Sequence, residues 1–258
     1  MLLLSVMSIG QAGAANTVWH PTAGMTWQIQ FSEPFTGNPL PVQVYDLDGF
    51  ETDARTVAAL HDNGIRVLCY ISMGTLEEWR PDAGDYPPEI IGNEWGDWPG
   101  EYFVDIRRID LLAPILEARL DMCASKGFDA VEPDNIDSYG NSSDVSGFPL
   151  TLDDQRSFDL WLANAAHERG LAIGQKNVPE LTGDLVATYD FAVTEDCVAD
   201  DWCEEVAPYL DANKPVFAIE YTDRTSEADF HTVCDAQTRP YSFVLKHREL
   251  DAWQLACS

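Results

Sequence analysis

Basic residues are scarce in this chain of 258 residues. Only 15 residues are lysine or arginine, against 44 aspartates and glutamates, and the formal net charge is -29. A field of this sign repels phosphate groups, which argues against nucleic acid and against a membrane surface as partners, and it attracts cationic ligands. An acidic surface with few lysines is also typical of salty or secreted environments, so both explanations of the charge stay open.

Long apolar runs are also missing. The N-terminal stretch MLLLSVMSIGQAGAAN is too short to span a membrane, and its small residues near Ala12 to Ala15 resemble a signal-peptidase site. We therefore predict that residues 1–15 are a signal-peptide remnant and that the protein is secreted to the extracellular space. No linker divides the rest, so residues 16–258 are predicted to form one catalytic domain.

The cysteines lack the spacing of a zinc site. They form no two closely spaced doublets, and five of the six lie apart from any histidine, which argues against metal ligation by cysteine. In an exported chain they are expected to form disulfides, although the residues alone leave many pairings open. The six are Cys69, Cys123, Cys197, Cys203, Cys234 and Cys257.

Strand-like runs recur along the chain with helix-like segments between them. The strands are predicted at residues 27–30, 41–49, 66–72, 128–134, 171–177, 190–196, 215–221 and 241–246. Helices are predicted within 52–64, 110–127 and 150–170, each of which ends at a glycine, and Thr151 with Asp154 forms a capping-box variant. Strands that alternate with helices pair in parallel, and eight such units predict an α/β protein with a single (β/α)8 TIM barrel. An open doubly wound sheet is the alternative.

Ionisable residues gather at the ends of the predicted strands. The stretch FDAVEPDNIDSYG places Glu132, Asp134 and Asp137 within six positions, and alternate residues of a strand share a face, so Glu132 and Asp134 point the same way. Barrels of this kind build their active sites at that rim. Taken singly, an aspartate at a strand end is often a turn former or a helix cap. The other strand-end residues of this kind are Asp46, Lys176, Glu195 and Glu220.

Clustered carboxylates without a nucleophilic serine or cysteine arrangement suit the hydrolysis of glycosidic bonds. One carboxylic acid protonates the leaving oxygen, while the other attacks the sugar or activates water. The five histidines fall in the N-terminal segment, in helices or in the region after the last strand, which argues against a histidine-based metal site or triad. Aromatic residues near the rim are expected either to stack on sugar faces or to plug the barrel. They are Tyr45, Tyr70, Tyr139, Tyr221, Trp79, Trp95 and Trp98.

Six blocks of the sequence together resemble a known family. The blocks YDLDGF, CYISMGTLEEWRPD, GFDAVEPDNIDSY, LAIGQKN, FAVTEDC and VLKHRELDAWQLAC are similar, in this order, to glycoside hydrolase family 114, the endo-α-1,4-polygalactosaminidases. The resemblance implies a (β/α)8 barrel, secretion, and hydrolysis of a cationic galactosamine-rich polysaccharide. It carries the catalytic pair over to Asp134 and Glu195. Thr194 and Gln175 depart from the family pattern and are expected to retune substrate choice.

The resemblance also suggests roles for individual residues. We assign Asp134 as the nucleophile and Glu195 as the general acid/base, with Asp137 as an alternative partner and Glu220 in reserve. The disulfides implied by the family are Cys69 with Cys123, Cys197 with Cys203, and Cys234 with Cys257. The predicted substrate-binding residues are Tyr45, Asp46, Tyr70, Glu132, Asp137, Lys176, Glu220 and Tyr221.

Two other classes of protein remain as alternatives. A carbohydrate-binding or inactive barrel would keep the aromatic residues without needing the carboxylates. A magnesium-dependent lyase or aldolase would use Asp46, Glu132, Asp134 and Glu195 as oxygen ligands, or Lys176 as a Schiff-base lysine. The reading that we prefer is a monomeric hydrolase that needs neither a metal nor a cofactor.

Overall fold

The structure is a computed structural model, and it describes residues 17–257 apart from residues 33–34, 36 and 97. The predicted signal-peptide remnant, residues 1–15, lies outside the described residues. The domain boundary at residue 16 therefore stays a prediction.

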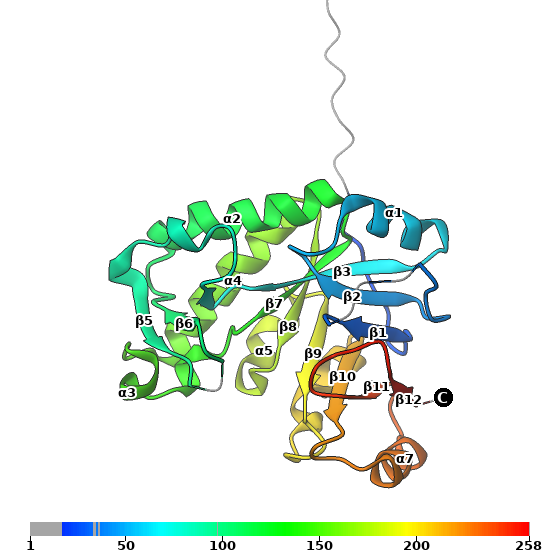
Figure 1. The fold of residues 1–258 in the computed structure, drawn as a ribbon. Coiled ribbons are helices and arrows are strands. Elements are labelled where there is room, and N and C mark those ends of the chain that lie inside the picture. Colours follow the sequence, from blue (N-terminus) through cyan, green and yellow to red (C-terminus); the bar gives the residue numbers. More distant parts are fainter. Residues whose placement is uncertain (1–16, 33–34, 36, 97, 258) are drawn as a thin grey trace, which may run out of the picture.

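Eight parallel strands form one curved sheet and follow each other in sequence order (Figure 1). Every neighbouring pair is parallel, and a short strand β12 (Leu255–Ala256) runs antiparallel to the last of them. The predicted (β/α)8 barrel is confirmed. Its strands are β1 (Trp27–Gln30), β2 (Val44–Asp48), β3 (Arg66–Ser72), β7 (Ala130–Asp134), β8 (Ala172–Lys176), β9 (Phe191–Glu195), β10 (Val216–Tyr221) and β11 (Ser242–Lys246).

Side chains join β1 to β11, where the sheet closes. The Trp27 indole N–H donates to the Ser242 carbonyl oxygen at 2.8 Å, and Lys246 Nζ donates to Gln28 Oε1 at 2.9 Å. Lys246 is fully buried, and burial lowers its pKa to about 7. Hydrogen bonds from side chains thus link β1 to β11, whereas backbone hydrogen bonds link the other neighbouring strands.

Helices cover the outer face of the sheet (Figure 1). The three predicted helices are present, and the capping box of Thr151 and Asp154 forms as expected. Gly127 takes a left-handed conformation (φ 91°) at the end of α2, which is the conformation that a glycine stop supplies at low cost. The helices are α1 (Ala54–Asp62), α2 (Ile109–Lys126), α3 (Ser143–Ser146), α4 (Leu152–Glu168), α5 (Thr182–Leu185), α6 (Ala207–Asp211) and α7 (Glu227–Ala236).

Two hydrophobic cores follow from the alternation of side chains along the strands. The larger core lies between the strands and the helices. The smaller one fills the barrel interior with residues such as Trp27, Phe191 and Phe217. Gly174 makes room inside, because a Cβ at this position would come within 2.3 Å of the Phe191 ring. The barrel interior is therefore filled with side chains and is not an open channel.

An insertion after β3 forms a second, three-stranded antiparallel sheet. It consists of β4 (Thr75–Glu77), β5 (Ile91–Glu94) and β6 (Glu101–Val104), paired in the order β4-β6-β5. None of the strands predicted from the sequence falls in this region. In Figure 1 the insertion extends to one side of the barrel, with α3 next to it.

Short 3₁₀ turns complete the connections between these elements. They are η1 (Ala83–Asp85), η2 (Pro88–Ile90), η3 (Ser138–Gly140), η4 (Pro179–Leu181) and η5 (Cys203–Val206).

The three disulfides are the pairs that the family resemblance implies. They join Cys69 with Cys123, Cys197 with Cys203, and Cys234 with Cys257. The first ties β3 to α2 and the third ties α7 to the end of the described chain. Within the described residues, no helix has both the length and the apolar character needed to cross a membrane.

Candidate active site

A cleft of about 560 Å³ opens at the carboxyl ends of the strands, between the barrel and the insertion. The barrel supplies its floor and the insertion supplies one wall. The barrel-strand residues that line it are Ile29, Asp48, Tyr70, Asp134, Lys176, Glu195 and Tyr221. The insertion and its turns contribute Glu77, Trp79, Arg80, Trp95, Trp98 and Glu101.

Lys176 lies at the centre of the floor. Its Nζ lies 2.9 Å from Glu132 Oε1, 2.9 Å from Asp134 Oδ1 and 3.4 Å from Glu195 Oε2. Burial alone would lower the pKa of Lys176, but the three carboxylates outweigh it and raise this pKa well above its usual value. The group is therefore an ammonium ion, which cannot attack a carbonyl as a Schiff-base lysine must. This ammonium also occupies the point where the carboxylates converge.

Asp134 is held as a carboxylate. Its Oδ1 accepts from Lys176, and its Oδ2 accepts a hydrogen bond of 2.9 Å from the Tyr70 hydroxyl. Burial acts to raise the pKa of Asp134, but the Lys176 ammonium and the two hydrogen bonds lower it below the usual range. The side chain is 20% exposed and lines the cleft, so an ionised oxygen is available to a ligand.

Glu195 lies on the other side of Lys176, at the end of β9. The Tyr221 hydroxyl donates to its Oε1 at 2.5 Å, and Asn177 Nδ2 donates to its Oε2 at 3.3 Å. Its backbone N–H donates to Asn177 Oδ1 at 3.0 Å, so one asparagine fixes both the backbone and the side chain. The Glu195 side chain is 31% exposed, which makes it the more open of the two carboxylates.

The residues that follow three of these strands have a left-handed backbone. Asn135, Asn177 and Asp196 have φ values of 61°, 51° and 53°, and each comes directly after the last residue of β7, β8 or β9. Asparagine and aspartate tolerate this conformation better than other non-glycine residues. Such positions are typical of active sites, and here they turn the chain sharply at the rim.

Two predicted contacts, Asp46 and Glu132, lie beneath the cleft rather than in it. Both are fully buried, and apart from each other the two Asp46 oxygens and Glu132 Oε2 have no hydrogen-bond partner among the described residues. Burial, followed by the charge of Glu132, raises the pKa of Asp46 well above its usual value. Burial next to another carboxyl group therefore favours the protonated, neutral form of Asp46, with Glu132 beside it.

Two further acids face the cleft with raised pKa values. Burial and then the charge of Asp134 raise the pKa of Asp137 to about 6. Burial raises the pKa of Glu101 to about 7, although Glu101 Oε1 accepts hydrogen bonds from Thr75 and Asn135. Both groups change charge near neutral pH, where a protonated amine on a ligand would favour their ionised forms.

Tyr45 and Glu220 lie outside the cleft. Tyr45 belongs to the outer core, where its hydroxyl accepts a hydrogen bond of 2.7 Å from the Leu40 N–H. Glu220 is fully buried and accepts from the backbone N–H groups of Val198 and Ala199 at 2.8 and 3.2 Å. Each lies one position away from an inward-pointing residue, and alternation along the strand turns it to the opposite face.

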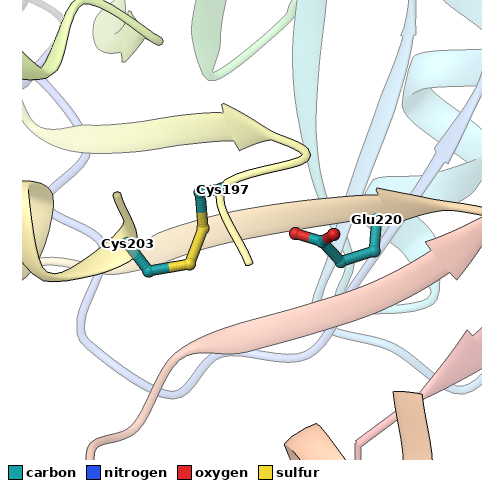
Figure 2. Close-up of side chains that lie close together, drawn as sticks. All are labelled: Cys197, Cys203 and Glu220. Atoms are coloured by element: carbon teal, nitrogen blue, oxygen red, sulfur yellow. A yellow bond between two sulfur atoms is a disulfide. The ribbon is translucent and has the colours of Figure 1, made fainter. Parts of the chain in front are cut away.

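Glu220 supports a rim segment that the second disulfide closes. Figure 2 shows the Glu220 carboxylate beside the Cys197–Cys203 bond. Among the described residues these three side chains are the one group whose spacing would suit a metal ion. Both sulfurs are committed to the disulfide, so no thiolate is left to bind a metal.

The cleft also contains residues that were not predicted from their position at strand ends. Arg80 is buried and bridges Asp48 and Glu77, with N···O distances of 2.7 and 2.9 Å. This ion-pair network joins the end of β2 to the insertion. Asn135 and Asn177 each come directly after a site residue at a strand end. Their position in the sequence would have been enough to predict them.

Comparisons with known proteins agree with this geometry. The sequence profile of glycoside-hydrolase family GH114 matches residues 8–258. The crystal structure of Aspergillus fumigatus Ega3 in complex with galactosamine is similar at a TM-score of 0.87 and 33% identity, over 95% of this chain and 100% of that chain. The glycoside hydrolase domain of PelA from Pseudomonas aeruginosa shares the fold at a TM-score of 0.70 and 16% identity, over 90% of this chain and 98% of that one.

A further relative is an uncharacterized protein of Thermotoga maritima, which is 26% identical over 156 residues. The match covers 54% of this chain and 48% of that protein, so the chain spans about half the length of this relative. The match to the family profile, by contrast, runs through nearly the whole sequence and includes every residue of the cleft. The chain belongs to glycoside-hydrolase family GH114.

Proposed function

We propose that the protein is a secreted, endo-acting hydrolase of α-1,4-linked, galactosamine-containing polysaccharide, with Asp134 and Glu195 as its carboxylate pair. One observation carries the proposal: a single ammonium group, Lys176, touches both carboxylates at the floor of an open cleft. Two carboxyl groups that face one sugar linkage are what glycoside hydrolysis requires.

The surroundings divide the work between the two groups. Asp134 has a lowered pKa and is ionised, so its oxygen is the nucleophile that attacks the anomeric carbon. Glu195 gives its proton to the leaving glycosidic oxygen, and the bond from that oxygen to the anomeric carbon breaks. Glu195 then takes a proton from water, whose oxygen displaces Asp134 from the sugar and restores both carboxyl groups.

The roles that we propose for the two carboxylates imply retention of configuration. A nucleophilic Asp134 forms a covalent intermediate with the sugar, and water then attacks from the side that the leaving group occupied. Retaining enzymes hold their carboxyl groups about 5 to 5.5 Å apart, whereas inverting enzymes need about 6.5 to 9.5 Å to admit a water molecule. Both carboxylates here approach one nitrogen, at 2.9 Å and 3.4 Å, and we expect the product to keep the anomeric configuration of the substrate.

Charge supports an amino sugar as the substrate. The chain has a net charge of -29, and a polymer of free galactosamine is cationic, so the long-range field favours their encounter. Ega3, a third identical in sequence, was crystallised with galactosamine. The three disulfides support secretion, because such bonds persist in oxidising compartments.

Product sizing with defined polymers tests the proposal. We expect the purified protein to shorten a deacetylated α-1,4-galactosamine polymer into oligomers. Asp134→Asn and Glu195→Gln keep the side-chain shape and should each lower turnover on the order of 10³-fold, while circular dichroism stays unchanged. The fully N-acetylated polymer serves as the comparison substrate, and a chelator should leave cleavage intact. Cleavage by either amide variant at the wild-type rate would refute the carboxylate pair.

A further inference from the structure

Two tryptophans are left half exposed at the cleft. Among the described residues, the large hydrophobic side chains that are exposed are Leu40, Trp79, Trp98, Val145 and Leu152. Only Trp79 and Trp98 are aromatic, at 54% and 53% exposure, and both line the cleft. Exposed indoles in a groove mark a surface that a ligand covers.

The insertion holds these indoles in place. Trp79 follows β4 and Trp98 lies in the turn between β5 and β6, and the Glu78 N–H donates to the Gly100 carbonyl oxygen at 2.9 Å, which joins the two turns. Gly100 has φ 87°, and a Cβ there would come within 2.8 Å of the Glu78 side chain. The close contact of the two turns therefore depends on this glycine.

Neighbouring contacts brace the same wall. The Trp98 N–H donates to the Trp95 carbonyl oxygen at 2.9 Å, and the Trp95 N–H donates to the Glu101 carbonyl oxygen at 2.7 Å. The Trp95 ring is stacked on Phe103 with centroids 5.3 Å apart and an interplanar angle of 23°. These contacts hold the backbone beside both exposed indoles, which lowers the entropy lost when a ligand binds.

A carboxyl group accompanies the indoles on this wall. Glu101 is 7% exposed and lines the cleft. Its Oε1 accepts from Asn135 at 2.8 Å and from Thr75, while Oε2 has no partner among the described residues. An aminopyranose matches this surface, because its C–H face packs on an indole while its ammonium group interacts with indole faces and with a carboxylate.

We propose that Trp79, Trp98 and Glu101 form a subsite for a second amino-sugar residue of the same polymer, on the wall of the cleft and not at the bond that is cleaved. The subsite rests on the proposed function, because its occupant is another unit of the substrate of Asp134 and Glu195. The wall belongs to the same cleft as the catalytic pair, so a single chain spans both. Its binding energy holds long chains in place and favours internal cleavage over the release of terminal units.

Kinetics on substrates of two lengths test this subsite. We expect the double variant Trp79→Ala/Trp98→Ala to raise KM on long deacetylated polymer about tenfold at unchanged kcat. On a galactosamine oligomer just long enough to be cleaved, the change should stay within about twofold. Trp19→Ala is the matched control, since it removes an indole that lines a different cavity, among residues of the opposite rim. Its KM values should equal those of the wild type on both substrates.

Binding to a non-cleaving background separates this inference from the proposed function. In Glu195→Gln protein, titration with long deacetylated oligomers should show about tenfold weaker affinity when both tryptophans are replaced. Adding Glu101→Gln instead should weaken binding of the deacetylated oligomer but not of its N-acetylated form.

The possible outcomes are distinct. If the wild type cleaves no galactosamine polymer, the proposed function fails, and the titration alone then decides the subsite. If the wild type cleaves the polymer but the double variant matches it in KM and in affinity, the subsite is overturned while the function stands. Equal losses on short and long substrates also overturn it, because the tryptophans would then act at the bond that is cleaved.

Discussion

Glu132 and Asp134 lie two residues apart on β7, point to the same face and contact the same lysine nitrogen at 2.9 Å, yet their surroundings oppose each other. The Glu132 side chain is sealed at 0% exposure, and burial raises its pKa. The Asp134 side chain is 20% exposed and has a lowered pKa. A shift of two residues along one strand therefore separates a sealed carboxyl group from one that faces the cleft.

The hydrogen-bond donors beside the two carboxylates explain the difference. Asp134 accepts a hydrogen bond from the Tyr70 hydroxyl and faces the cleft, so one side of its carboxylate is open to solvent. Glu132 instead lies beside Asp46, which is also buried and whose raised pKa favours its neutral form. A neutral Asp46 adds no negative charge beneath Lys176, which leaves the ammonium to Glu132, Asp134 and Glu195. The buried acids shape the electrostatics of the floor, and the two carboxylates that face the cleft are the ones to which we assign the reaction.

Of the variants considered, replacement of Lys176 should have the largest effect, because Glu132 and Asp134 both depend on its charge. Lys176→Met takes the positive charge from three carboxylates, so we expect the free energy of unfolding at pH 7 to fall by about 3 to 5 kcal/mol. We also expect kcat/KM to fall about 100-fold or more. The pKa of Asp134 should rise, and because the reaction needs its ionised form, the acid limb of the pH profile of kcat/KM should move to higher pH.

Lys214→Met supplies the control for this prediction. Lys214 is also partly buried, but it donates to the carbonyl oxygens of Val186 and Tyr189 and does not line the cleft. Its loss should lower stability without moving the acid limb. An acid limb that stays in place in Lys176→Met would show that the lysine does not hold Asp134 in its ionised form.

Asp46→Asn should have a smaller effect, which is on stability, and it tests the charge state of the buried acids. The pKa of Asp46 is raised well above its usual value, chiefly by burial, so the fold favours its neutral form, which an amide imitates. A carboxyl group with a raised folded pKa stabilises the fold fully below its unfolded pKa and loses this contribution as pH rises through the folded pKa. The amide does not titrate, so between pH 5 and pH 8 the stability of the variant should rise relative to wild type, by up to about 1.4 kcal/mol for each pH unit over which Asp46 stays protonated in the fold and ionised in the unfolded chain.

Urea unfolding of both proteins at pH 5 and pH 8 measures this difference. Asp46→Ala is the companion variant, because it removes the hydrogen bond to Glu132 as well as the acid and should be less stable at both pH values. A loss of stability in Asp46→Asn that grows with pH would mean that Asp46 is ionised in the fold.

The fold was more accessible from the sequence than the insertion was. Eight apolar runs bounded by turn residues predicted the eight strands, because buried parallel strands carry that pattern in their own residues. The sheet of β4, β5 and β6 has strands of three or four residues with charged and polar side chains, and it forms only through tertiary pairing. Its residues carried no strand period, so the region resembled a loop.

Part of the candidate site could also be predicted from the sequence. Alternation and strand-end position brought Asp134, Lys176 and Glu195 together, because both follow from backbone geometry. Proximity to a strand end also drew in Tyr45 and Glu220, although the same alternation turns them to the outer face. Depth was beyond the sequence: no pattern in the letters EPD distinguishes the sealed Glu132 from the open Asp134, since burial depends on residues from neighbouring strands.

The smallest effect should come from two tyrosines on opposite faces of neighbouring strands. Tyr70 donates to Asp134 in the cleft, whereas Tyr45 accepts from the Leu40 N–H in the outer core. Tyr45→Phe should lower the free energy of unfolding by about 1 kcal/mol, the usual net value of one hydrogen bond, and should leave kcat and KM within about twofold. Tyr70→Phe, the matched variant, should lower kcat about tenfold, because Asp134 loses a donor that holds and orients its charge. Equilibrium unfolding and steady-state kinetics on one galactosamine polymer measure both, and a KM change in Tyr45→Phe would place this tyrosine at the substrate after all.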